Sequence, residues 1–155
     1  MATSTPRARP YSQFNFQVRI GNDKGDQPNA GFQEVSGLGT EIHIAEYRAG
    51  NWTDNSPIKV NGSYKVPDVT LKRGVIGELV LLHAWLKAVR DGGNGADVLK
   101  PVTIVLLAED RVTAAQTWTL TNARPMKYTG PSLTGKGTDV AIEELVLSCE
   151  HIEVT

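Results

Sequence analysis

Phe32-Gln33-Glu34-Val35-Ser36-Gly37-Leu38 is the first of three short runs that decide the fold of this 155-residue chain. The others are Val69-Thr70-Leu71-Lys72-Arg73-Gly74 and Ala123-Arg124-Pro125-Met126-Lys127-Tyr128-Thr129-Gly130-Pro131. Each is a strand-like run ended by a glycine, so the three are expected at joints of an all-β domain. None contains a nucleophile beside a base or donors spaced for a metal ion, so their importance is architectural.

Period-two alternation predicts most of the remaining strands. Phe14, Phe16, Val18 and Ile20 alternate with polar residues, as in a half-buried strand. Further strands are predicted at 31–36, 40–48, 66–72, 102–108, 116–128 and 139–154. Residues 102–108 are apolar except for Thr103, which indicates burial on both faces.

One helix is predicted, over residues 77–91. Leu82, Trp85, Leu86 and Val89 form an apolar stripe at helical spacing, and Gly92-Gly93 ends it. One helix with seven or eight strands predicts a mainly β fold with two packed antiparallel sheets, as a sandwich or a rolled barrel. The helix is expected at the periphery, over one open end. Residues 1–12 lack periodicity and are predicted to be a flexible arm, followed by a single domain over 13–155.

Two segments depart from simple strand patterns. Residues 49–65 are rich in turn formers and are predicted to be a long loop, yet they contain Trp52, Ile58 and Val60. Loops of this length are uncommon in compact domains, so docking of the loop on another surface is expected. In the last strand the apolar positions change phase at Glu143-Glu144. A β-bulge there would bring both apolar sets onto one face.

The amino-acid composition argues against several classes of protein. The net charge of −1 does not suit a protein that binds nucleic acid through a basic surface, and it permits close self-association. The single cysteine, Cys149, excludes an internal disulfide. No apolar h-region and no apolar run of about 20 residues is present, so neither a signal peptide nor membrane insertion is expected.

The three runs, in this order and with a helix after the second, resemble the inner tube proteins of contractile phage tails and of related bacterial contractile injection particles. The resemblance covers residues 14–154. It implies a structural, non-enzymatic protomer that forms hexameric rings, which stack into a hollow tube. It further implies a surrounding sheath, baseplate and terminator proteins, and a lumen that passes DNA or a protein effector. Assembly is expected in the bacterial cytoplasm, within a virion tail or an injection particle that can be released.

The resemblance also implies which residues make the contacts. Contact between rings is assigned to Trp52, Ile58, Val60, Lys72 and Arg73. Ring closure is assigned to strand residues Glu34, Ile42, Arg124 and Glu143. From the sequence alone, Lys72-Arg73 also fits a solvated strand end, and Trp52 equally fits an aromatic folded back on its own domain.

The sequence gives little support for a nucleotide-binding, metal-binding or catalytic site. Gly130 to Lys136 has the GxxxxGK spacing of a phosphate-binding loop, but Gly137 stands where a magnesium-binding hydroxyl is needed, and a strand rather than a helix follows. His43, His83 and His151 share no ligand spacing with Cys149, so no metal or other cofactor is expected. Three alternatives to the tube stay open: a monomeric ligand-binding β-barrel, a secretion-tube protein of the haemolysin-coregulated type, and a hydrolase with an unrecognised site.

Overall fold

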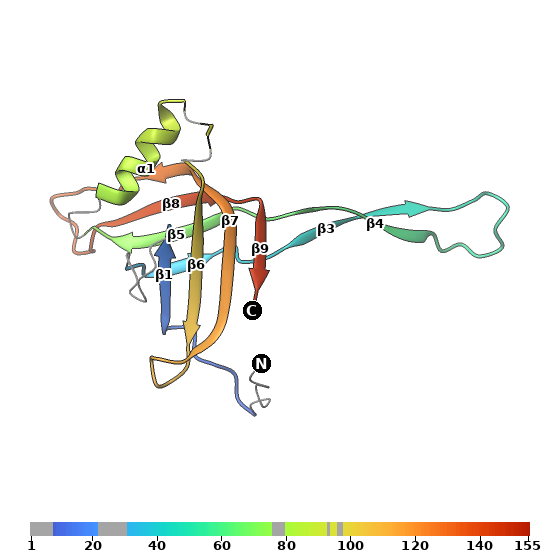
Figure 1. The fold of residues 1–155 in the computed structure, drawn as a ribbon, viewed down its shortest axis with the longest axis horizontal. Coiled ribbons are helices and arrows are strands. Elements are labelled where there is room, and N and C mark those ends of the chain that lie inside the picture. Colours follow the sequence, from blue (N-terminus) through green and yellow to red (C-terminus); the bar gives the residue numbers. More distant parts are fainter. Residues whose placement is uncertain (1–7, 22–30, 76–79, 93, 96–97) are drawn as a thin grey trace.

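The computed structural model describes residues 8–21, 31–75, 80–92, 94–95 and 98–155. Within them lie nine strands and one helix (Figure 1). In chain order they are β1 (Phe16–Ile20), β2 (Glu34–Ser36), β3 (Glu41–Tyr47), β4 (Ile58–Lys65), β5 (Val69–Gly74), α1 (Val80–Arg90), β6 (Lys100–Leu107), β7 (Ala114–Thr129), β8 (Ile142–Ser148) and β9 (His151–Val154). The predicted mainly β fold with one helix is confirmed.

Seven strands form one antiparallel sheet that rolls over on itself. Its order is β1-β6-β7-β8-β5-β2, and β9 also pairs with β7. The 16-residue β7 makes the roll possible, since its first part pairs with β6 and β9 and its last part pairs with β8. In Figure 1 the strands β1, β6 and β9 and the first part of β7 therefore run nearly at right angles to β5 and β8.

The corner of the roll lies at Asn122, which has a positive φ of 53°. Its Nδ2 donates a hydrogen bond of 2.8 Å to Oε2 of Glu150, at the break between β8 and β9. Asparagine tolerates this left-handed backbone better than most residues. The predicted continuous strand 139–154 is consequently wrong: the chain follows β7 but is interrupted at Cys149-Glu150.

The core fills the space between the two halves of the rolled sheet. Every second residue of its strands points inward, and the fully buried side chains are Val18, Ile20, Val69, Leu71, Val102, Ile104, Leu120 and Leu147. Helix α1 covers one end of this core with Leu82 and Trp85, as its apolar stripe predicts. The Trp85 Nε1 donates to the carbonyl oxygen of Val98 at 2.6 Å, which satisfies the buried indole. No helix among the described residues has the length and apolarity to cross a membrane.

The predicted bulge at Glu143-Glu144 is wrong. Residues Val69 to Gly74 pair with Leu147 to Ile142 in unbroken register, so Glu143 shares the inner face with Leu145 and Leu147. Val140 precedes the strand and is exposed, which explains the apparent change of phase. The register shift lies instead on β7, between Pro125 and Lys127.

The predicted loop 49–65 is also wrong in part, because residues 58–65 are strand β4. This strand pairs with β3 in a separate two-stranded sheet, and the connecting loop is correspondingly shorter. The apolar residues of the segment are thus strand residues, and their alternation was obscured by Asn61 and Gly62.

Gly37 directs the chain from the body of the domain into β3, and replacing it should be costly. Its φ is +85°, and an added Cβ would lie 2.2 Å from the carbonyl oxygen of Asp68. Gly37→Ala should therefore lower the thermal midpoint of unfolding sharply. Gly39→Ala is the matched control, since nothing lies within 4 Å of its Cβ position. Equal midpoints for the two variants would contradict this role of Gly37.

Candidate functional site

The β3–β4 hairpin projects from the body as a long two-stranded arm (Figure 1). Every residue of both strands is exposed. The large hydrophobic side chains among them are between 43% and 63% exposed: Ile42, Ile44, Tyr47, Ile58, Val60 and Tyr64. So many exposed apolar side chains on one projecting element mark an interaction site.

The two faces of the hairpin differ in charge. Tyr47 lies opposite Ile58, and Ala45 opposite Val60, so these four residues share one face, here called the apolar face. The other face, here called the mixed face, holds Ile42 and Ile44 together with the cross-strand pair Glu46 and Lys59. Toward its tip the hairpin thus offers one uncharged and one partly charged surface, whereas at the base the pair Glu41 and Lys65 lies on the side of the apolar face.

The tip of the hairpin is held by its own contacts. Nε of Arg48 donates to the carbonyl oxygen of Asp54 at 3.0 Å, and its Nη2 donates to that of Trp52 at 3.2 Å. The Trp52 ring meets Tyr47 edge to face, with ring centroids 5.7 Å apart. Trp52 therefore packs on its own hairpin and extends the apolar face, while it stays partly exposed.

The base of the hairpin is fastened to β9. The Tyr64 hydroxyl is hydrogen-bonded to Nδ1 of His151 and lies 3.4 Å from the carbonyl oxygen of Glu150. The two rings are also in contact, with centroids 5.6 Å apart. The arm therefore leaves the body in a fixed direction rather than from a free loop.

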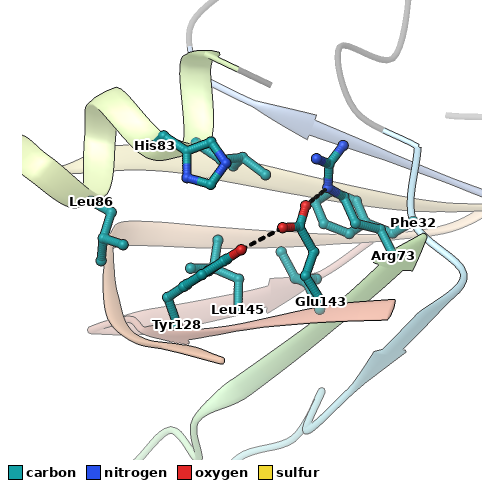
Figure 2. Close-up of a pocket in the computed structure, with 9 residues that line it drawn as sticks. Phe32, Arg73, His83, Leu86, Tyr128, Glu143 and Leu145 are labelled. Atoms are coloured by element: carbon teal, nitrogen blue, oxygen red, sulfur yellow. Dashed lines mark hydrogen bonds and ion pairs between the residues drawn. The ribbon is translucent and has the colours of Figure 1, made fainter. Parts of the chain in front are cut away.

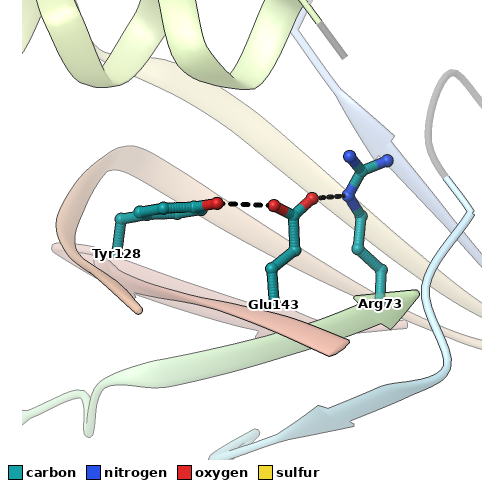
Figure 3. A network of polar contacts seen from close by, with 3 residues as sticks. All are labelled: Arg73, Tyr128 and Glu143. Atoms are coloured by element: carbon teal, nitrogen blue, oxygen red, sulfur yellow. Dashed lines mark hydrogen bonds and ion pairs between the residues drawn. The ribbon is translucent and has the colours of Figure 1, made fainter. Parts of the chain in front are cut away.

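Arg73 and Glu143, assigned to two different interfaces, are bonded to each other inside the protomer (Figure 3). Arg73 continues the inward alternation of Val69 and Leu71 and is 5% exposed, whereas Glu143 is 6% exposed. The expectation of an exposed basic pair at Lys72-Arg73 is therefore wrong for Arg73. Its Nε donates to Oε1 of Glu143, and the Tyr128 hydroxyl donates to Oε2 at 2.7 Å.

This buried network lies beneath α1, in a narrow pocket that Phe32, Leu86 and Leu145 also line (Figure 2). The His83 ring contacts Tyr128 edge to face at 5.6 Å. Burial opposes ionisation of Glu143, but the hydrogen bonds from Tyr128 and Arg73 and the Arg73 charge outweigh it and lower the Glu143 pKa. The hydrogen bond to Glu143, followed by burial, raises the pKa of Tyr128.

Glu143 should make the protein sensitive to acid. Because its folded-state pKa lies below the ordinary value of 4.5, the ionised carboxylate stabilises the fold above about pH 4.5. This contribution is lost as the pH falls through the lower, folded-state pKa. Thermal unfolding of Glu143→Gln, followed from about pH 7 to about pH 3, should therefore depend less on pH than that of the parent. Glu144→Gln serves as control, and equal acid sensitivity of parent and Glu143→Gln would contradict the assignment.

The remaining predicted contact residues are at the surface. Lys72 and Glu34, cross-strand neighbours on β5 and β2, form an ion pair of 3.9 Å. Arg124 lies 4.0 Å from Glu150. Exposed pairs at these distances contribute little to stability and remain accessible to a partner.

The described residues offer no catalytic or metal-binding constellation. No group of three or more His, Cys, Asp or Glu side chains within them could hold a metal ion. The segment around Lys136 is a turn between β7 and β8, and strand β8 follows it as expected. Burial, followed by the charge of Asp68, raises the pKa of the Cys149 thiol, which disfavours the reactive thiolate.

The sequence match agrees with this picture of a structural domain with an exposed arm. The family model of the T4-like virus tail tube protein gp19 matches residues 12–153. The chain belongs to this tail tube family. It is therefore a structural, non-enzymatic tail tube protein of a contractile tail or an extracellular contractile injection system, as predicted. No curated protein sequence matches the chain.

Solved structures of similar proteins come from contractile particles. The tail tube protein is 26% identical to a chain of the PVC sheath-tube complex of an extracellular contractile injection system, with a TM-score of 0.78 and coverage of 96% of this chain and 93% of the other. A chain of the PVC sheath/tube terminator is 25% identical, with a TM-score of 0.81 and coverage of 95% and 97%. A chain of the anti-feeding prophage cap shares the fold at 24% identity, with a TM-score of 0.82 and coverage of 100% and 99%.

Proposed function

We propose that this tail tube protein forms hexameric rings that stack into a hollow tube. The observation that carries the proposal is the β3–β4 hairpin, whose six large hydrophobic side chains are exposed on an arm that projects from the body. A ring or tube covers this surface with other copies of the chain. The near-zero net charge supports close packing of many copies.

The two faces of the hairpin suggest that one face closes the ring and the other contacts the next ring. We assign ring closure to the mixed face with Ile42, together with Glu34 on the edge strand β2 and the partly exposed Arg124 on β7. Contact between rings is assigned to the tip and apolar face, namely Trp52, Ile58 and Val60, and to Lys72 on β5 of the body. Arg73 and Glu143 are left out of both interfaces because they are buried against each other.

The relatives suggest further partners. Similar chains occur in sheath-tube, terminator, cap and baseplate complexes, which supports a surrounding sheath, terminator proteins and a baseplate for this chain as well. The lumen would pass DNA in a virion or a protein effector in an injection particle. Assembly would take place in the bacterial cytoplasm, before release of the particle.

Light scattering of the purified protein tests the ring directly. The expected mass is about six times the 16.8 kDa of one protomer, or a multiple of that value when rings stack. A mass of one protomer at every concentration would contradict the proposal. It would favour the alternative of a monomeric β-barrel, although large side chains fill the interior of the rolled sheet.

A further inference from the structure

Within the residues that the structure describes, a helix covers the core of the protomer at one end only. Helix α1 covers it with Leu82 and Trp85, whereas the end away from α1 carries side chains that pack on the core but are only partly buried. These are Phe16, Val35, Leu38 and Trp118. A hydrophobic core left open in this way gains stability from any apolar group that covers it.

At this open end lies a groove of about 680 Å³, here called the seam groove. Its lining includes Tyr11, Phe14 and Phe16 on one side and Val35 and Leu38 on the other, with Trp118 between them. β1 and β2 are the two end strands of the sheet, so the groove lies where the rolled sheet fails to close. Phe14 is 68% exposed at its rim.

The charges restrict what the groove can accept. Among the described residues that line it, Glu34 alone is charged, and Glu34 is already paired with Lys72. A charged or strongly polar segment would therefore lose solvation there without gaining a partner. Toward the tip, the apolar face of the hairpin carries Tyr47, Ile58 and Val60 without a charged side chain, and this part loses little on entry. Its charged pair, Glu41 and Lys65, lies at the base of the hairpin.

The hairpin cannot enter its own groove, because it projects away from the body (Figure 1). Its eight-residue strand β4 spans roughly 26 Å, which is enough to reach a neighbouring molecule. We propose that the seam groove of one copy is the seat for the apolar face of the hairpin of a second copy. This inference rests on the proposed function and adds to it the surface that receives the arm.

Cross-linking between two kinds of single-cysteine copies tests this seat. In a Cys149→Ser background, one copy carries Val60→Cys on the hairpin and the other carries Gln13→Cys at the groove. A short bismaleimide should join the two copies in assembled material. The matched control replaces Gln13→Cys by Leu133→Cys, because Leu133 is an exposed apolar residue, 83% accessible, in the β7–β8 turn, away from the groove. This pair should not react.

Charge insertion gives an independent readout. Phe14→Glu should abolish tubes without changing the melting curve of the protomer, since Phe14 is mostly exposed, whereas Leu133→Glu should leave tubes intact. Parent tubes without a Gln13–Val60 cross-link, or with a cross-link only to position 133, would overturn the seat and leave the proposed function standing. Tubes from Phe14→Glu would overturn it too. A parent that forms no rings or tubes would instead defeat the proposed function.

Discussion

Replacing residues 43–63 by an Asn-Gly turn should give a folded, soluble protomer that no longer forms tubes. Ile42 and Tyr64 are direct cross-strand partners, so a two-residue type I′ turn can join them. The hydrophobic core of the described residues takes no side chain from 41–65, so the body should keep its fold. Circular dichroism would report the fold, and electron microscopy the loss of assembly.

A matched pair of point variants sharpens this prediction. Ile58→Ser with Val60→Ser alters the apolar face, whereas Glu46→Gln with Lys59→Gln alters only the charged pair of the mixed face. The first pair should weaken assembly strongly, because fully burying a Val or Ile side chain contributes about 1.5–3 kcal/mol. The second should change it little. Long tubes from the shortened variant would place the stacking contact elsewhere, and an unfolded variant would make the arm part of the folding unit.

The second large effect concerns the buried ion pair. Glu143→Ala would leave the Arg73 guanidinium buried without its carboxylate, which should cost about 3–5 kcal/mol. Since domains are typically stable by only about 5–15 kcal/mol, this is a large loss. Replacing both residues by leucine should restore most of the stability, because a buried pair can be exchanged for apolar side chains at little cost.

Urea unfolding of the shortened, monomeric protein is the appropriate measurement, since assembly would otherwise add to the apparent stability. Glu144→Ala is the control, because the Glu144 side chain points away from the core. We expect a change within about 0.5 kcal/mol for this variant. Equal losses for Glu143→Ala and Glu144→Ala would show that the pair is not a special feature of the core.

The sequence predicts elements that have a strong period of their own. The helix was recognisable from Leu82, Trp85 and Val89, and their burial confirms it. The same alternation could have placed Arg73 and Glu143 inside, because each continues the inward positions of its strand. The charge of both residues argued for the surface instead, since either one alone would be too costly to bury. Only their direct cross-strand pairing makes the inward positions possible.

The first strand of the hairpin was predicted at 40–48, but its second strand, β4, was missed for a different reason. Asn61, Gly62 and Ser63 resemble a loop, and every residue of β4 is exposed in the described part of the chain, so no core-facing pattern reveals this strand. The attachment of Tyr64 to His151 joins residues 87 positions apart, and no local signal points to it. The seam groove likewise depends on which strands end the sheet, which is a property of the whole topology.

Negative-stain electron microscopy of the purified full-length protein tests the central claim most directly. The account predicts rings with six-fold symmetry and a central hole, alone or stacked into tubes of uniform width. Monomers without rings at all concentrations, or rings with another symmetry, would contradict it.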